Sequence, residues 1–302
     1  MPSQMTDNEK ETLYAAFSEN KKGIGLEHQK RAYLAAKEFL RRYKGDKDNY
    51  VKEAQEFLTN FEKGVTQYEL FITYGAKNYA KTFALGRPLL KDQPESFFVL
   101  GVLGEAGYEN ALSGNASFND ETIDYLRRAI QLLEAGKVTQ ADPFKSVDVA
   151  RGFLNSALGW FLKEKSPVEA AASFRKSVQS NSPYRNDALT YYRLGVAILK
   201  GEFAQLSAEY NEKFGAKRGS TEQRAMFERI NHLVEEAVDA YARAFALSDP
   251  QRSQAGIGGP KLTPEFRSKL LEQLTALYKG LHNESDAGLT ELIANVLSKP
   301  LP

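Results

Sequence analysis

The chain has 302 residues, of which 42% are hydrophobic and 26% are charged, so its composition is that of a folded globular protein and excludes a disordered tail. Lys and Arg total 40 against 39 Asp and Glu, and this balance leaves no net field that would recruit nucleic acid. Cysteine is absent, which excludes disulfides, thiol catalysis and cysteine-ligated metals.

Helical spacing of apolar residues dominates from the N-terminus onward, and no run alternates as a strand would. The first part predicts helices near 7–19, 26–44 and 48–74, the last with Gly64 inside it. A fourth helix is predicted near 76–91. Pro88 lies inside that fourth pattern, so we expect the helix to kink or to end early there.

Two ordinary helix pairs follow, at 95–113 with 119–136 and at 146–165 with 167–181. The next pair is longer, because Gly195 and Ala237 lie 42 positions apart, against 11 for the corresponding Gly159 and Ala170. The spacing predicts two extended arms at 187–213 and 220–248 that form a projecting antiparallel hairpin. Gly201 is the point where the first arm could break, and Ser220 with Gln223 forms a capping-box pattern.

The C-terminal part predicts a loop over 251–260 and then two helices. Thr263-Pro264 is a strong helix start for the first, which runs to about Leu281. The second begins near Ser285 and ends before Lys299. Two such helices suit the end of a repeat array, which needs a cap with a polar outer face.

A spaced signature links the helix pairs. A Leu-Gly dipeptide in the first helix is followed in the second by a small residue, a large one and another small one at 0, +4 and +7. The copies are Leu158-Gly159 with Ala170, Phe174 and Ser177; Leu194-Gly195 with Ala237, Tyr241 and Ala244; and a degraded copy, Leu100-Gly101 with Thr122, Leu126 and Ala129. The signature resembles that of the tetratricopeptide repeat (TPR) family. The run from Leu277 to Pro300 resembles the end of bacterial TPR proteins of unassigned function.

The resemblance implies an all-α, right-handed solenoid of about five helical hairpins with C-terminal capping helices and one extended hairpin. Its expected segments are 1–64, divergent hairpins; 65–250, repeats including the extended hairpin at 187–248; and 251–302, the cap. In it, Gly159 and Gly195 would let helices approach closely, while Phe174 and Tyr241 would fill the space between neighbouring repeats.

We expect the protein to be a non-enzymatic scaffold that binds a partner peptide or helix in a concave groove. The predicted groove residues are Phe98, Phe153, Ser156, Trp160, Lys163, Tyr192, Val196 and Lys200. Trp160 stands where TPR proteins that clamp a peptide carboxylate carry Asn, so that clamp is not expected. On the extended hairpin, Phe203, Leu206, Tyr210, Met226 and Phe227 are expected to join the arms, with any leftover residue free for a partner or a homodimer.

Two alternatives stay open: a small-molecule-binding protein or enzyme with an apolar groove, and a structural subunit of a larger assembly. No catalytic set, metal site or cofactor motif is found, since His28, His232 and His282 are far apart in sequence. Gly256–Lys261 is read as a surface loop rather than a phosphate loop, and Glu105 with Glu109 as part of an acidic helix face.

The sequence does not decide the compartment. No run approaches the ~18 apolar residues of a membrane span, and the N-terminus as numbered has no apolar signal region, which favours a cytoplasmic protein. If a leader has been removed, the resemblance instead implies an exported or periplasmic one. Protein or peptide partners are expected, and nucleic acid is not.

Overall fold

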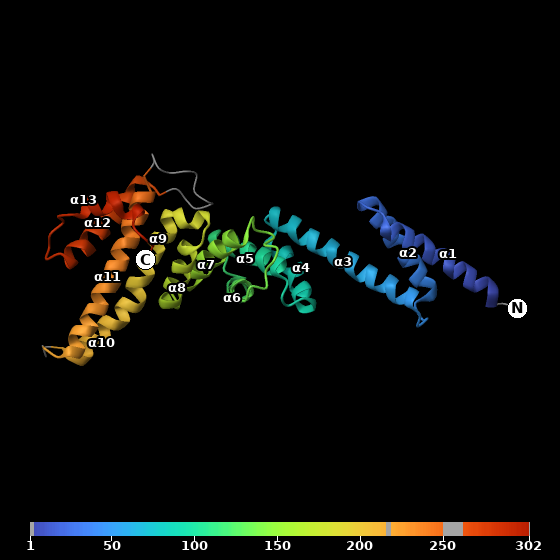
Figure 1. Cartoon of the computed structure of the whole chain (residues 1–302), viewed down its shortest axis with the longest axis horizontal. Helices are drawn as coiled ribbons and strands as arrows, with labels where there is room; N and C mark the ends of the chain where they lie inside the picture. Colours follow the sequence, from blue (N-terminus) through green and yellow to red (C-terminus); the bar gives the residue numbers. More distant parts are fainter. Residues whose placement is uncertain (1–2, 216–218, 250–261, 302) are drawn as a thin grey trace. The chain divides into compact units, whose positions relative to one another are not determined.

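The computed structural model describes residues 3–215, 219–249 and 262–301. Over these ranges the chain is all-α, which confirms the predicted class, and it contains no strand (Figure 1). In the same ranges no helix combines the length and the apolar character needed to cross a bilayer. The predicted loop at 251–260 and the Gly256–Lys261 segment lie outside the described residues.

The chain forms two compact units, Met1–Pro94 and Glu95–Pro302. The first contains α1 (Ser3–Lys22), α2 (Leu26–Tyr43), α3 (Asn49–Gly75) and α4 (Tyr79–Asp92). The predicted division between 1–64 and 65–250 falls inside α3, which stays helical through Gly64. This helix begins at Asp48, whose side chain accepts a hydrogen bond from the backbone N–H of Val51 at 3.0 Å.

The N-terminal half of α3 shares a core with α1 and α2, and its C-terminal half packs against α4. Buried residues of the shared core are Phe17, Ala32, Ala36, Phe39, Val51 and Ala54. Helix α4 does not end at Pro88, as one reading of the sequence expected, but continues to Asp92. Leu89 and Leu90 are buried just beyond the proline, and their burial offsets the hydrogen bond that the ring removes.

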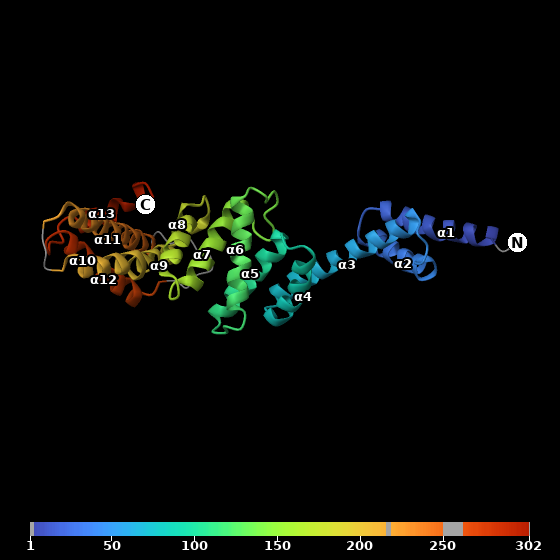
Figure 2. The same ribbon diagram turned by 90° about the horizontal axis from the view of Figure 1, so that it is seen from below.

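The second unit is a succession of helices packed in chain order. Its α-helices are α5 (Phe97–Leu112), α6 (Asn119–Glu134), α7 (Val147–Leu162), α8 (Pro167–Gln179), α9 (Ala188–Ile198), α10 (Ala204–Phe214), α11 (Thr221–Leu247), α12 (Pro264–Leu281) and α13 (Leu289–Asn295). Each helix from α5 to α8 contacts the next one along the chain, and α11 contacts α9 and α12 (Figures 1 and 2). Short 3₁₀ turns lie at Pro183–Asn186 and Val296–Ser298.

Signature glycines face the large residues of their partner helices. A β-carbon at position 159 would come within 2.8 Å of the Phe174 ring, and one at 195 within 2.4 Å of the Tyr241 ring. Each ring therefore fills the space left by the glycine inside its own helix pair, a contact that the signature did not predict. In the degraded copy it is Gly104, not Gly101, that faces Leu126, since Gly101 lies against Pro143 and Phe144.

Gly201 does not break the first arm of the extended hairpin. Residues Leu199–Phe203 form a π-helical turn between α9 and α10, so the arm continues to Phe214. A β-carbon at position 201 would come within 2.9 Å of the backbone nitrogen of Val168, which shows how closely this turn approaches the start of α8. A glycine is needed here for helix packing rather than for a chain break.

The predicted helix starts in the second unit agree with the structure. Ser220 Oγ accepts a hydrogen bond from the backbone N–H of Gln223 at 3.0 Å, while Gln223 Oε1 reaches back to accept one from the N–H of Gly219 at 2.8 Å. Thr263 caps α12 by accepting from the N–H of Phe266 at 3.2 Å, with Pro264 as the first helical residue. The start of the second arm and the start of the C-terminal helices were therefore correctly placed.

Candidate functional site

Half-buried aromatic rings of α5 and α7 gather in the second unit, and we call them, with two adjacent cations, the aromatic surface. Its members are Tyr108, Phe153, Trp160, Phe161, Lys163 and Arg193. Tyr108 lies at the centre, with ring centroids 5.8 Å from Phe153, 5.5 Å from Trp160 and 6.2 Å from Phe161. All three contacts are edge to face, the geometry that aromatic pairs prefer.

Two cations border these rings. Lys163 Nζ lies 4.0 Å from the centroid of the Trp160 ring, and Arg193 Nη1 donates a hydrogen bond to the Tyr108 hydroxyl at 3.4 Å. Partial burial and the nearby Arg193 lower the pKa of Lys163. Within the described part of the chain neither cation has an ion-pair partner. Positive charge at this edge of the aromatic surface is therefore only partly compensated, by the neighbouring Glu164.

A carboxyl group lies on the same helix as Tyr108, one turn earlier. Burial, with a smaller contribution from the Glu109 charge, raises the pKa of Glu105 to about 7. Burial also raises the pKa of Tyr184, and the nearby Tyr108, Asp187 and Glu105 raise it further. Tyr184 meets Phe153 edge to face at 6.4 Å. Ionising Glu105 in this apolar setting is therefore unfavourable in the folded state.

Glu105→Gln is expected to flatten the pH dependence of stability. The folded-state pKa is raised to about 7, so the unfolded chain loses this proton first and wild-type stability falls as the pH rises from about 4.5 to 7. Glutamine has no proton to lose, so the variant is expected to gain about 2 kcal/mol relative to wild type between pH 5 and pH 8. Urea unfolding followed by Trp160 fluorescence at both pH values measures the difference. Parallel profiles for the two proteins contradict the prediction, and Glu109→Gln, which removes only the smaller cause, is expected to have a weaker effect.

The structure brings together only some of the predicted groove residues. Phe153, Trp160 and Lys163 belong to the aromatic surface, whereas Ser156 is buried and its hydroxyl lies 3.3 Å from that of Thr190 on α9. Tyr192 stacks on Tyr241 at 5.7 Å and meets Phe266 of α12 at 4.7 Å. A C-terminal helix therefore packs over the ring that was expected to face a partner.

The remaining predicted groove residues are not members of the aromatic surface. Phe98 and Val196 are half-buried on α5 and α9, and Lys200 is exposed and pairs with Glu164 at 3.0 Å. Sequence reasoning missed Tyr108, Tyr184 and Arg193. The sequence could have indicated Tyr108, because Gly101, Glu105 and Tyr108 are spaced four and three residues apart. This spacing places them on one face of α5.

The extended hairpin behaves largely as its pattern suggested. Leu206 and Met226 are buried, while Phe203 is half-buried in the π-helical turn. Tyr210 lies 6.1 Å from Phe227 between ring centroids, and its hydroxyl accepts a hydrogen bond from Gln223 at 3.1 Å. Phe227 remains 51% exposed and is the hairpin aromatic left for an external contact.

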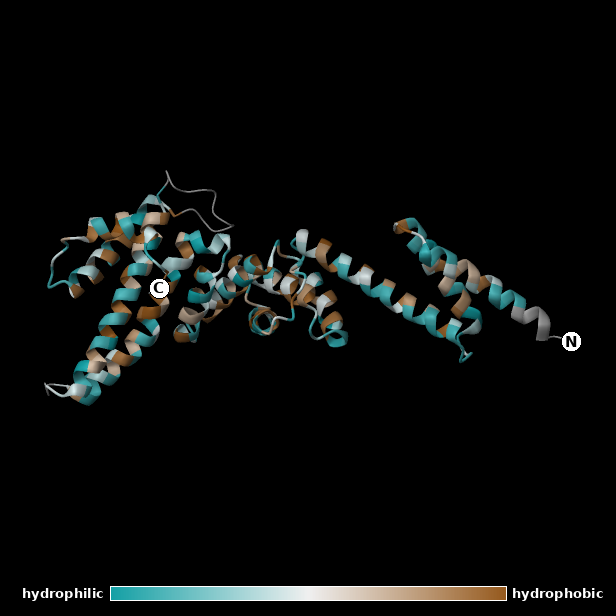
Figure 3. Cartoon of the chain, viewed as in Figure 1, coloured by the Kyte–Doolittle hydropathy of each residue, from teal (hydrophilic) through white to brown (hydrophobic). Residues whose placement is uncertain are grey.

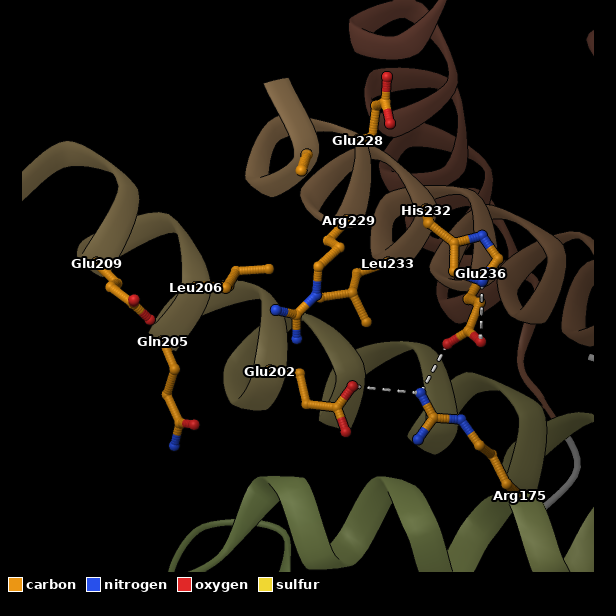
Figure 4. Close-up of a pocket in the computed structure, with 11 residues that line it drawn as sticks. Arg175, Glu202, Gln205, Leu206, Glu209, Glu228, Arg229, His232, Leu233 and Glu236 are labelled. Carbon is orange, nitrogen blue, oxygen red and sulfur yellow. Dashed lines mark hydrogen bonds and ion pairs between the residues drawn. The ribbon is translucent and has the colours of Figure 1, made fainter. Parts of the chain in front are cut away.

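A pocket of about 950 Å³ opens between α8 and the two arms of the hairpin (Figure 4). Arg175 of α8 projects into it and reaches Glu236 of α11 at 2.6 Å and Glu202 of the π-helical turn at 3.8 Å. His232 lies 3.9 Å from the same Glu236, and Leu206 and Leu233 provide apolar lining. Arg175 thus ties three segments together by pairing with Glu236 and Glu202.

In the part of the chain that the structure describes, no three or more His, Asp or Glu side chains are grouped so as to hold a metal ion. Comparison with known proteins finds no match: no family model, no curated protein and no solved structure matches the chain. The function therefore has to be argued from the chain's own residues.

Proposed function

We propose that the chain is a helical-repeat protein of the TPR type that binds a segment of a partner protein on the aromatic surface. Support for the repeat class comes from helices packed in chain order and from the glycine–ring contact in each helix pair that carries the full signature. The single observation that carries the binding role is the set of half-exposed rings around Tyr108, bordered by two cations.

The composition of this surface favours a protein partner. Trp, Tyr and Arg are the residues that dominate binding energy at protein interfaces, and Trp160, Tyr108 and Arg193 lie together here. Edge-to-face packing holds the rings in place before binding, which lowers the entropic cost of association. The partner segment would place an apolar side chain against the rings.

The positive charges of the aromatic surface indicate which residue types the partner segment carries. Neither Lys163 nor Arg193 forms an ion pair within the described residues, and the pKa of Lys163 is lowered by burial and by Arg193, with a smaller opposing effect of Glu164. A carboxylate from the partner would offset both effects. We therefore expect an acidic residue close to an apolar one in the bound segment.

Selection of peptides from a random phage-displayed library, with counter-selection against Trp160→Ala, tests this proposal. Selected peptides are expected to be acidic and apolar, and to change the fluorescence of Trp160, the single tryptophan of the chain. Lys163→Ala is expected to weaken binding about tenfold, which corresponds to roughly 1.4 kcal/mol. Lys200→Ala is the matched control, because this exposed lysine already pairs with Glu164.

The proposal fails if no sequence is enriched over the counter-selected variant, or if the selected peptides bind Trp160→Ala as tightly as wild type. Thermal unfolding followed by circular dichroism establishes that the alanine variant is folded. Trp160→Phe, which keeps an aromatic ring, is expected to retain most of the affinity.

A further inference from the structure

An uninterrupted apolar stripe runs along the whole of α3. Its members follow one another at alternating intervals of three and four residues: Val51, Ala54, Leu58, Phe61, Val65, Tyr68 and Ile72. This is the spacing of the core positions in a heptad repeat, the pattern of a helix that lies side by side with another helix over its full length. Figure 3 shows hydrophobic and hydrophilic bands alternating along α3.

Within the described residues of the first unit, only the first half of this stripe is covered. Val51 and Ala54 are buried in the core shared with α1 and α2, and Phe61 stacks on Tyr33 of α2 at 4.8 Å. In the second half, Val65 is 51%, Tyr68 68% and Ile72 49% exposed. Helix α4 packs on another face, where Leu70 and Thr73 are buried.

Exposure of three large apolar side chains within about two helical turns marks a contact surface rather than ordinary surface variation. Their exposed parts amount to roughly 300 Å². In a dimer with a twofold axis, each copy would bury this patch. With the polar residues around the two patches, the total buried area would be near the lower end of specific interfaces, about 1,000 Å².

The charges beside the stripe identify the kind of partner. Beside the stripe, Glu69 pairs with Lys81 at 2.6 Å, and the Tyr33 hydroxyl donates to Glu62 at 3.1 Å. These groups are already satisfied within the first unit, so the stripe has no strong field that would select an oppositely charged protein. An apolar stripe whose flanking acidic groups are engaged within its own unit is complementary to itself.

We infer that the exposed half of the α3 stripe, Val65, Tyr68 and Ile72, is a homodimer contact in which α3 of a second copy of this chain lies alongside it. The established seam of α3 with α1 and α2 continues in register into this contact, so the same helix uses one stripe for intramolecular and intermolecular packing. An interface at the small end of the specific range is expected to be transient, with a dissociation constant on the order of 1–100 µM.

Sedimentation velocity of the full chain over a concentration series spanning that range tests the inference. Wild type is expected to shift from monomer to dimer, and Tyr68→Glu to weaken the dimer at least about thirtyfold, because two buried carboxylates would face an apolar stripe. Leu34→Glu is the matched control: Leu34 is 65% exposed in the same unit but lies on α2 two residues from both buried Ala32 and Ala36. Leu34→Glu is expected to leave the distribution between monomer and dimer unchanged.

Single cysteines give an independent readout, because the chain contains none of its own. Under mild oxidation at least one of Val65→Cys, Tyr68→Cys and Ile72→Cys is expected to form a disulfide-linked dimer rapidly, and Leu34→Cys is not. A wild type that remains monomeric throughout the series overturns the inference, and so does crosslinking of Leu34→Cys as fast as that of the stripe variants. If α3 instead binds a different protein, the wild type alone would remain monomeric throughout the series.

Discussion

Arg243→Ala is expected to lower the free energy of unfolding of the Glu95–Pro302 unit by about 3–5 kcal/mol. Arg243 of α11 is buried, and its Nε donates to Asp239 at 2.6 Å. Its Nη2 donates to the backbone carbonyl oxygen of Pro300, also at 2.6 Å, while the guanidinium carbon lies 5.9 Å from the Tyr191 ring. Alanine would leave Asp239 and the C-terminal carbonyl without their shared donor.

Urea unfolding followed by Trp160 fluorescence measures this loss, since the single tryptophan belongs to the same unit. Arg243→Lys keeps the charge but not the fork of donors, so it is expected to recover only part of the stability. In a double-mutant cycle, Asp239→Ala should cost less in the Arg243→Ala background than in wild type. Equal stability of Arg243→Ala and wild type would show that the C-terminal contact carries no free energy.

Gly195→Ala is expected to destabilise the same unit by about 1–3 kcal/mol, although alanine is the better helix former. The new β-carbon would come within 2.4 Å of the Tyr241 ring. That ring cannot easily retreat, because Tyr192 stacks on Tyr241 at 5.7 Å and is itself held against Phe266. The strain would separate α9 from α11, the two arms at the base of the extended hairpin.

Gly280→Ala provides the control for helix propensity. Gly280 lies in α12, and no atom lies within 4 Å of the place where its β-carbon would stand. The substitution is expected to raise stability by up to about 0.5 kcal/mol, measured by the same urea unfolding. If both variants shift stability in the same direction, close packing against Tyr241 is not the reason for Gly195.

Local rules predicted the helices well, because apolar spacing and capping residues act within a few positions of one another. Ser220 and Thr263 were placed correctly at helix starts for that reason. Pro88 and Gly201 misled the same rules. The burial of Leu89 and the close approach of Val168 come from other turns and other helices, and they outweigh the local preference to end a helix.

The candidate site was predicted only in part for a similar reason. A repeat signature specifies the spacing within one helix pair, but neither the ring that Gly159 meets nor which rings of different pairs meet. Trp160 was among the predicted residues, whereas Tyr108 and Arg193 join it from α5 and α9, far away in sequence. Tyr192 was assigned to the groove because nothing in its own helix indicates that Phe266 packs against it.

The π-helical turn at Leu199–Phe203 sets the rotational phase of the whole extended hairpin. Such a turn holds one residue more than the equivalent stretch of α-helix, and each residue turns an α-helix by about 100°. If all five residues were α-helical instead, Leu206 and Tyr210 would be rotated by about 100° away from α11. The inner face of the hairpin therefore depends on the π conformation of this turn.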